Sequence, residues 1–301
     1  MEKTASVEAP PLVKRGASNR MLVDFAELIK ARLTLLVLLT TAVGFYLGAA
    51  TVEPLALFHV VFGTALAAAG AAALNQWWEY RLDALMHRTR TRPIPGGRMS
   101  PRDALLLGSS LGVAGVLYLA VACNALSALL AAATIGIYLF GYTPLKRISV
   151  SNTLVGAVPG ALPPMIGWAA ARHDLSWPAW SLFAILFCWQ MPHFFAIAWM
   201  FRDDYARAGF RMLSSRDLNG IRSGRQSVFF AVLLLGASVL PALLGITSRT
   251  YLPLVLLLGV LFLGLAVRFY FKRETAEARR LFVGSIIYLP LLLATLVLTK
   301  S

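Results

Sequence analysis

The feature that most limits the fold of this chain is a series of nine apolar stretches, each long enough to cross a bilayer as a helix. They cover residues 33–51, 55–78, 104–121, 125–142, 153–171, 179–200, 228–247, 252–271 and 281–299. Charged residues are only 14% of the 301 and lie in clusters between these stretches. In lipid a chain must satisfy its backbone hydrogen bonds internally, which helices do. We therefore predict an all-α, polytopic membrane protein with about nine transmembrane helices.

The distribution of Lys and Arg predicts the orientation of these helices. With the N-terminus inside, 25 of the 28 basic residues fall in the tail and in the cytoplasmic loops, and three fall outside. An odd number of spans then places the C-terminus outside. The net charge of +14 is explained by these loops and by contact with anionic lipid headgroups, so no nucleic-acid partner is expected.

The domain organisation follows from the same pattern. We assign residues 1–30 to a cytoplasmic N-terminal tail and residues 31–301 to one nine-helix domain. The run 65–74 consists almost entirely of Ala and Gly, which is typical of close helix packing in membranes. Cys123 and Cys188 are too isolated to indicate a disulfide framework or a zinc site.

Polar side chains gather where the second apolar stretch ends. Asn75, Glu79 and Asp83 are spaced by four residues and therefore share one helix face. Stacked carboxylates repel one another unless a cation lies between them, and oxygen ligands beside an amide suit Mg²⁺. The alternative is a solvated helix end at the headgroup level. Arg88 and Arg92 follow directly, and guanidinium groups beside a metal-binding face fit a diphosphate, although the positive-inside rule also accounts for some arginines here.

Two further clusters follow other spans on the same predicted face. Tyr142, Lys146 and Arg147 come at the end of the fourth span, where a hydroxyl donor and a point-charge cation would suit a diphosphate oxygen. Asp203 and Asp204 come just after the sixth span.

His193 lies within the sixth span, about 15 Å deeper than Asp204 by helical rise. An ionisable residue at such depth is a functional candidate, whereas a histidine that only packs is the alternative.

Together these clusters resemble the UbiA-type intramembrane prenyltransferases, and within them the branch that farnesylates haem. The resemblance covers residues 29–299 and is carried by four spaced motifs. The motifs are Asn75 to Asp83, Met86 to Pro93, Tyr142 to Arg147 with Gly156 to Pro164, and Trp189 to His193 leading to Asp204–Tyr205 and Ala208–Gly209. Two departures stand out. Many members have Asp where Glu79 stands, and Ala208 replaces the second aspartate of the usual second motif.

The resemblance implies a UbiA-type helix bundle and an enzyme that joins farnesyl diphosphate to a vinyl group of haem b, with Mg²⁺ as cofactor. It implies that Asn75, Glu79, Asp83 and Asp204 hold the metal and act in catalysis. By the same resemblance Arg88, Arg92, Tyr142, Lys146 and Arg147 bind the diphosphate, and His193 is a haem ligand or proton relay.

The resemblance also implies partners and a location. The substrates and membrane lipid are expected to bind the chain, which could associate with a haem A synthase or a terminal oxidase assembly. The expected location is the bacterial inner membrane, or the mitochondrial inner membrane in a eukaryote. A UbiA-type enzyme acting on an aromatic quinone precursor is the closest alternative. A transporter is a more distant one, because paired interrupted helices in inverted repeats are not evident.

Overall fold

A computed structural model of the chain describes residues 17–301 and contains no β-strand within them. Nine helical stretches in this part are long and apolar enough to cross a membrane, as the sequence predicts. Seven of these stretches are single helices. Five of the seven are α2 (Ala31–Gly48), α3 (Pro54–Asp83), α4 (Pro101–Ala122), α13 (Tyr251–Lys272) and α14 (Thr275–Leu298). Two more are α9 (Trp177–Met200) and α12 (Ile221–Leu243). The all-α, multi-pass prediction is thereby confirmed.

The other two spans are each broken into shorter pieces. One consists of α5 (Ala125–Gly136), the π-helix η1 (Ile137–Tyr142) and α6 (Thr143–Ile148). The other consists of α7 (Asn152–Ala161) and α8 (Pro163–Arg172). A proline lacks an N–H and clashes with the carbonyl four residues earlier, so Pro144 and Pro163 explain why the regular helix is interrupted near them.

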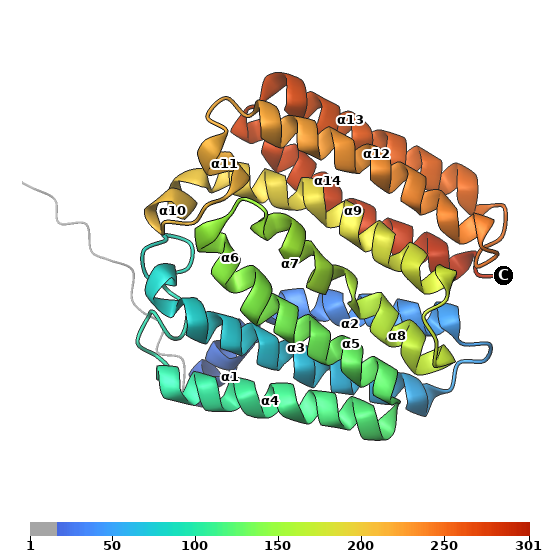
Figure 1. The fold of residues 1–301 in the computed structure, drawn as a ribbon, viewed down its shortest axis with the longest axis horizontal. Coiled ribbons are helices and arrows are strands. Elements are labelled where there is room, and N and C mark those ends of the chain that lie inside the picture. Colours follow the sequence, from blue (N-terminus) through green and yellow to red (C-terminus); the bar gives the residue numbers. More distant parts are fainter. Residues whose placement is uncertain (1–16) are drawn as a thin grey trace, which may run out of the picture.

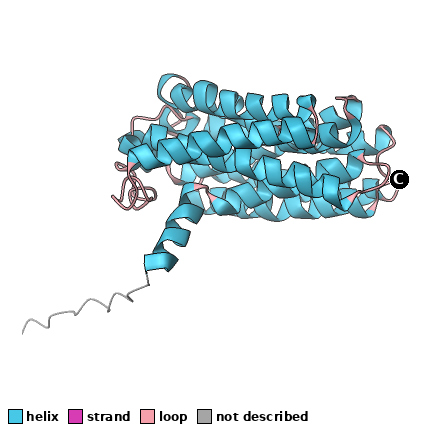
Figure 2. Cartoon of the chain, turned by 90° about the horizontal axis from the view of Figure 1, so that it is seen from below, coloured by secondary structure: helices cyan, strands magenta, loops and turns pink. Residues whose placement is uncertain are grey.

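Figures 1 and 2 show the long helices lying side by side in one bundle. Three short helices, α6, α10 (Arg202–Arg207) and α11 (Leu213–Arg216), lie at one end, where α1 (Ala17–Leu28) also meets the bundle (Figure 1). The C-terminus lies at the opposite end. The short helices and loops that carry the polar motifs therefore lie together at one end of the bundle.

Close helix contacts use small residues, as the alanine-rich run predicts. A Cβ atom on Gly70 of α3 would overlap the backbone of Gly112 of α4, so only glycine permits this approach. Gly44 of α2 faces the backbone of Pro164 of α8 in the same way. Small residues increase van der Waals contact between helices where lipid supplies no hydrophobic drive.

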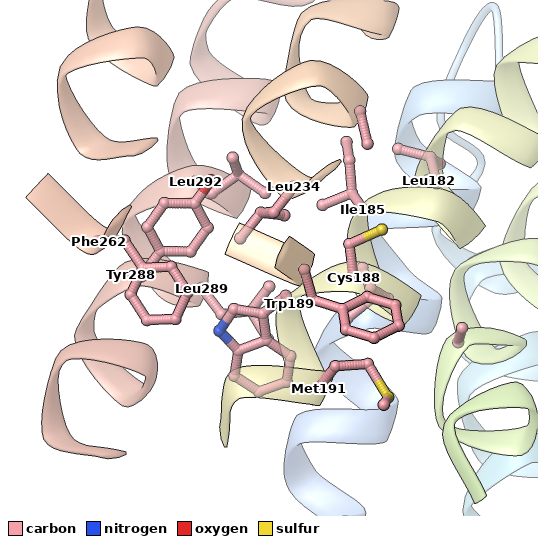
Figure 3. Packing of buried hydrophobic residues seen from close by; sticks show 14 of the residues in the cluster. Leu182, Ile185, Cys188, Trp189, Met191, Leu234, Phe262, Tyr288, Leu289 and Leu292 are labelled. Atoms are coloured by element: carbon pink, nitrogen blue, oxygen red, sulfur yellow. The ribbon is translucent and has the colours of Figure 1, made fainter. Parts of the chain in front are cut away.

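The largest apolar core joins α9 to the C-terminal helices α12, α13 and α14. Figure 3 shows part of it, including Leu182 and Trp189 of α9, Leu234 of α12 and Tyr288 of α14. All of these side chains are buried. The helix α9 therefore forms a central support, from which the chain turns at Phe201 into α10 at the polar end.

Candidate active site

The site begins at the C-terminal end of α3. Asn75, Glu79 and Asp83 lie on one helix face, and only 1%, 4% and 1% of their surfaces are exposed. The burial of both carboxylates excludes the alternative in which they lie at a solvated helix end. Buried charges persist only when they are paired or hydrogen-bonded, and both of these are.

Glu79 is paired with Lys146, which α6 brings to it. Lys146 Nζ lies 2.9 and 2.8 Å from the two carboxylate oxygens, and Asn75 Nδ2 donates a further hydrogen bond to Glu79 at 3.0 Å. The Lys146 ammonium also lies 4.4 Å from the centre of the Tyr142 ring, a cation–π contact. Tyr142 and Lys146 are therefore one turn apart on the site side, even though Pro144 lies between them.

Asp83 is paired with Arg92 from the loop that follows α3. Arg92 Nη1 donates to Asp83 Oδ2 at 2.7 Å, and the Thr89 hydroxyl donates to the Asp83 carbonyl at 2.8 Å. The loop therefore folds back over the end of its own helix. Arg88, from the same loop, donates to the Tyr205 hydroxyl of α10 at 2.7 Å and stacks on that ring.

Lys30 also reaches the site, although our domain division places it in the N-terminal tail. Its Nζ donates to Asn75 Oδ1 at 2.7 Å and to the Tyr138 hydroxyl at 3.1 Å. Lys30 lies in the turn between α1 and α2 with a left-handed φ of 50°, and Gln76 holds this turn by donating to the carbonyls of Glu27 and Leu28.

The surroundings of Lys30 change its acidity. Burial lowers the pKa of Lys30 to about 7, and the positive charges of Arg92 and Lys146 act in the same direction. An anion bound beside these three cations would favour the protonated ammonium. In sequence, Lys30 counts only as one of several basic residues before the first span. Nothing in its spacing marks it as a site residue.

These groups surround a cavity of about 150 Å³. Its lining consists of Lys30, Asn75, Glu79, Asp83, Met86, Arg88, Arg92, Tyr138, Tyr142, Lys146, Tyr205, Phe210 and Met212. Four of these side chains are cationic and two are carboxylates, so the lining carries a formal charge of +2. A small, partly open and positively charged cavity fits a polyanion such as a diphosphate.

Four residues predicted for the site or considered beside it are not part of the cavity lining. Asp204 is buried at the start of α10 and forms an ion pair with Arg207. The side chain of Asp203 is 89% exposed, and that of Arg147 is exposed as well. His193 lies within α9 and is hydrogen-bonded to Ser285 of α14. Because α9 ends at Met200, before Asp204, the helical rise that predicts the separation between His193 and Asp204 applies only as far as Met200.

The donor set fits a hard divalent cation completed by substrate oxygens. Within residues 17–301 no group of three or more His, Cys, Asp or Glu side chains is clustered tightly enough to form a metal cage. Two carboxylates and an amide nevertheless share one face of the cavity. Mg²⁺ is commonly bound by one or two carboxylates, with the remaining ligands supplied by water and phosphate. The residues present therefore suit Mg²⁺ bound together with a diphosphate.

Comparison with known proteins places this geometry in context. The UbiA prenyltransferase family matches residues 37–293. The protoheme IX farnesyltransferase of Solibacter usitatus (strain Ellin6076) is 44% identical over 287 residues, which are 92% of this chain and 98% of the relative. The protein of the same name from Koribacter versatilis (strain Ellin345) is 40% identical and covers 99% of both chains.

Solved structures share the fold at low sequence identity. A structure of digeranylgeranylglyceryl phosphate synthase has a TM-score of 0.78 at 16% identity and covers 93% of this chain and 98% of its own. A UbiA homologue from Archaeoglobus fulgidus, bound to DMAPP and Mg²⁺, has a TM-score of 0.68 at 13% identity, covering 91% and 99%. The bundle described above is therefore the fold of these proteins.

Proposed function

Because this chain belongs to the UbiA prenyltransferase family, we propose that it transfers the farnesyl group of farnesyl diphosphate to a vinyl group of haem b, giving haem O and diphosphate. The observation that carries the proposal is the cavity at the end of α3, where four cations and two carboxylates meet. The names of the 44% and 40% identical relatives support haem as the acceptor.

The cations would bind the leaving group and stabilise the charge that develops on it. The bond between C1 of the farnesyl group and the diphosphate oxygen breaks, and its electron pair leaves with the diphosphate. Arg88, Arg92, Lys146 and Lys30 surround the volume in which that charge would appear. Preorganised donors of this kind commonly contribute about 3 kcal/mol each in the transition state.

Mg²⁺ would be held by Glu79 and Asp83, with Asn75 beside them, and Asp204 of α10, outside the cavity lining, is a further candidate ligand. When bound, the metal withdraws charge from the diphosphate and so promotes its departure. Lys146 and Arg92, which here pair with Glu79 and Asp83, would contact phosphate oxygens once these carboxylates serve as metal ligands. Asn75 would keep Glu79 oriented through its hydrogen bond during this exchange.

The acceptor would approach from the apolar interior of the bundle. A vinyl carbon of haem b forms the new C–C bond with C1 of the farnesyl group. Water then adds its hydroxyl to the remaining vinyl carbon and releases one proton, which gives the hydroxyfarnesylethyl side chain. Met86, Phe210 and Met212 line part of the cavity and would limit the access of water to the reacting carbon before that step.

The decisive experiment is incubation of the purified protein with haem b, farnesyl diphosphate and Mg²⁺, followed by mass analysis of the haem. We expect a mass gain equal to one farnesyl group plus one hydroxyl. Samples without Mg²⁺, or with the cation chelated, are expected to show little product. Transfer to an aromatic quinone precursor, with unchanged haem, would instead support the rival prenyltransferase.

The bacterial relatives also support a location in the bacterial inner membrane, where the substrates would reach the bundle through lipid. Delivery of the product to a haem A synthase or a terminal oxidase assembly by direct association is part of the proposal. Co-purification of such a partner from native membranes tests it.

A further inference from the structure

The outer surface of the bundle carries a groove between α13 and α14. The groove has a volume of about 560 Å³ and is open along one side. Its lining includes Leu265 of α13 and, from α14, Arg279, Arg280, Val283, Gly284 and Ile287. No residue of this lining belongs to the cavity at the end of α3. The groove is therefore a separate feature, which the proposed function does not use.

The inner part of the groove is an apolar helix face. Steps of three and four residues lead from Arg280 through Val283 to Ile287, so these residues lie on one side of α14. Val283 and Ile287 are 46% and 55% exposed. A Cβ atom on Gly284 would overlap the Leu265 side chain, so glycine at this position lets Leu265 pack directly on α14. In a bundle that crosses a membrane, exposed apolar side chains of this kind face the acyl chains of lipid.

The other end of the groove is strongly basic. The segment 268–280, which joins α13 to α14, contains five cations and two carboxylates, and therefore has a formal charge of +3. The cations are Arg268, Lys272, Arg273, Arg279 and Arg280, and the carboxylates are Glu274 and Glu277. An anion would be attracted to this end of the groove.

Glu277 holds three of these cations around a single carboxylate oxygen. Its Oε1 accepts hydrogen bonds from Arg268 and Arg280, and Lys272 Nζ lies 3.8 Å away. The carboxylate is buried, whereas about half of each cationic side chain is exposed. One carboxylate neutralises only one of the three positive charges. Arg279 adds another charge, because it forms no ion pair with any residue of the described range 17–301.

The groove has the depth of one lipid leaflet. The junction of α13 and α14 lies at the same end of the bundle as the short helices, opposite the C-terminus (Figure 1). The charge distribution predicts that this end faces the cytoplasm. From Arg280 to Ile287 the helical rise is about 10 Å, and the hydrocarbon of one leaflet is about 15 Å thick. The cations therefore lie at the level of the headgroups, and the apolar face extends inward beside the acyl chains.

We propose that this groove binds an anionic phospholipid of the cytoplasmic leaflet. The headgroup phosphate is bound by Arg279 and Arg280, since guanidinium groups form bidentate hydrogen bonds with phosphate oxygens. One acyl chain lies along Val283 and Ile287. Glu277 is a positioning residue that orients Arg280 towards the groove. Basic pockets between transmembrane helices on the cytoplasmic side are suited to acidic lipids.

Inorganic phosphate and farnesyl diphosphate share the phosphate chemistry of this ligand. Inorganic phosphate has no apolar part that would use the groove. The groove lining includes no carboxylate that would hold a metal beside a diphosphate, in contrast to the cavity at the end of α3. A phospholipid with a single phosphate and an acyl chain therefore fits the groove better than either. This lipid site does not depend on the identity of the prenyl acceptor.

The first test is native mass spectrometry of the purified full chain, titrated with phosphatidylglycerol or with phosphatidylcholine of the same acyl chains. We expect the parent protein to bind one phosphatidylglycerol at least tenfold more tightly than phosphatidylcholine. Each arginine beside an anionic lipid contributes about fivefold in affinity. The double variant Arg279→Gln, Arg280→Gln should therefore bind phosphatidylglycerol roughly thirtyfold more weakly and lose the preference.

The double variant Arg102→Gln, Arg273→Gln is the matched control for charge. Both arginines are exposed at helix ends on the predicted cytoplasmic face, and neither lines the groove. This control loses the same net charge and should bind phosphatidylglycerol as the parent protein does. Equal losses in the two double variants would show a general effect of surface charge and overturn the inference.

The apolar part of the groove is tested with all charges kept. Ile287 lines the groove, whereas its neighbour Ile286 is 48% exposed and does not. Ile287→Trp fills the groove and should weaken phosphatidylglycerol binding at least fivefold, while Ile286→Trp should leave it unchanged. Equal affinities in these two variants would overturn the acyl-chain site. Displacement of the lipid by an equal concentration of inorganic phosphate would overturn it as well.

The parent protein and the other occupants decide the matter even if a variant fails to fold. A parent protein without preference for phosphatidylglycerol overturns the lipid site, whatever the variants do. Farnesyl diphosphate that displaces phosphatidylglycerol from the parent protein one for one would assign the groove to the isoprenoid instead. A dimer of the parent protein that Ile287→Trp dissociates would assign it to a second copy of the chain. Either result overturns the inference.

Discussion

Lys146 Nζ contacts both carboxylate oxygens of Glu79, a residue 67 positions earlier in the chain. Each of these groups would be an uncompensated buried charge without the other, and breaking such a pair commonly costs about 3–5 kcal/mol. The ion pair therefore stabilises both buried charges while no substrate is bound. When the substrate binds, Glu79 would hold the metal and Lys146 would contact the diphosphate.

This relationship predicts different kinetic effects for the two partners. Glu79→Gln should lower kcat about hundredfold, equivalent to roughly 3 kcal/mol, and raise the Mg²⁺ concentration needed for half-maximal rate. Lys146→Met should also lower kcat, because its ammonium would stabilise the charge on the departing diphosphate, but it should not raise the Mg²⁺ concentration needed for half-maximal rate. Steady-state haem farnesylation across a Mg²⁺ series measures both. Near-normal turnover of Glu79→Gln at limiting Mg²⁺ would exclude a metal-binding role.

Arg92 and Arg90 lie in one loop but differ in their contacts. Arg92 is paired with Asp83 and lines the cavity, whereas Arg90 is exposed. Arg92→Met should lower kcat/KM about tenfold to a hundredfold, because a hydrogen bond to a charged group is worth about 1.5–3 kcal/mol. Arg90→Met makes the same change of charge and should stay within about twofold. Equal losses in the two variants would point to a general effect of loop charge.

Lys30 and Arg32 provide a second matched pair. Lys30 is hydrogen-bonded to Asn75 inside the cavity, and Arg32 is exposed two residues later. We expect Lys30→Met to weaken the binding of farnesyl diphosphate about thirtyfold, from the loss of about 2 kcal/mol of charge-assisted contact. Arg32→Met should bind normally. Isothermal titration calorimetry measures both, and unchanged affinity in Lys30→Met would remove Lys30 from the site.

Asp203 and Asp204 are neighbours with opposite exposure. Asp204 is buried and paired with Arg207, whereas the side chain of Asp203 is almost fully in solvent. Asp204→Asn should reduce haem farnesylation about as strongly as Glu79→Gln. Asp203→Asn should have a small effect. A larger loss from Asp203→Asn than from Asp204→Asn would reverse the assignment of the second acidic motif.

Much of this site could be predicted because helix geometry relates spacing to position. A step of four residues places Asn75, Glu79 and Asp83 on one face whatever surrounds the helix, and the structure has them so. The nine spans could be predicted for a similar reason, since length and apolarity are set by the bilayer. Both inferences depend on local sequence alone.

The remaining parts depend on contacts that no local pattern encodes. Lys30 enters the cavity because Gln76 closes the turn between α1 and α2, a contact across 49 residues. Tyr138 joins the site because the π-helix η1 turns its hydroxyl towards Asn75. Arg147 looks equivalent to Lys146 in sequence, yet its side chain is exposed, because adjacent residues on a helix point in different directions.

The orientation of the bundle in the membrane is open to a direct test. By the sequence count, 25 of the 28 Lys and Arg residues fall in the N-terminal tail and in the loops predicted to face the cytoplasm, and the candidate active site lies at the end of the bundle that carries the described loops of this set. The C-terminus lies at the opposite end (Figure 1). By the positive-inside rule, the site end faces the cytoplasm and Ser301 faces away from it.

A reporter that is active only outside the cytoplasm should therefore be active when fused after Ser301. The same reporter inserted between Ser214 and Gly224 should be inactive, because that segment follows α10 at the site end. Reversed signals at the two positions would place the diphosphate site on the other side of the membrane.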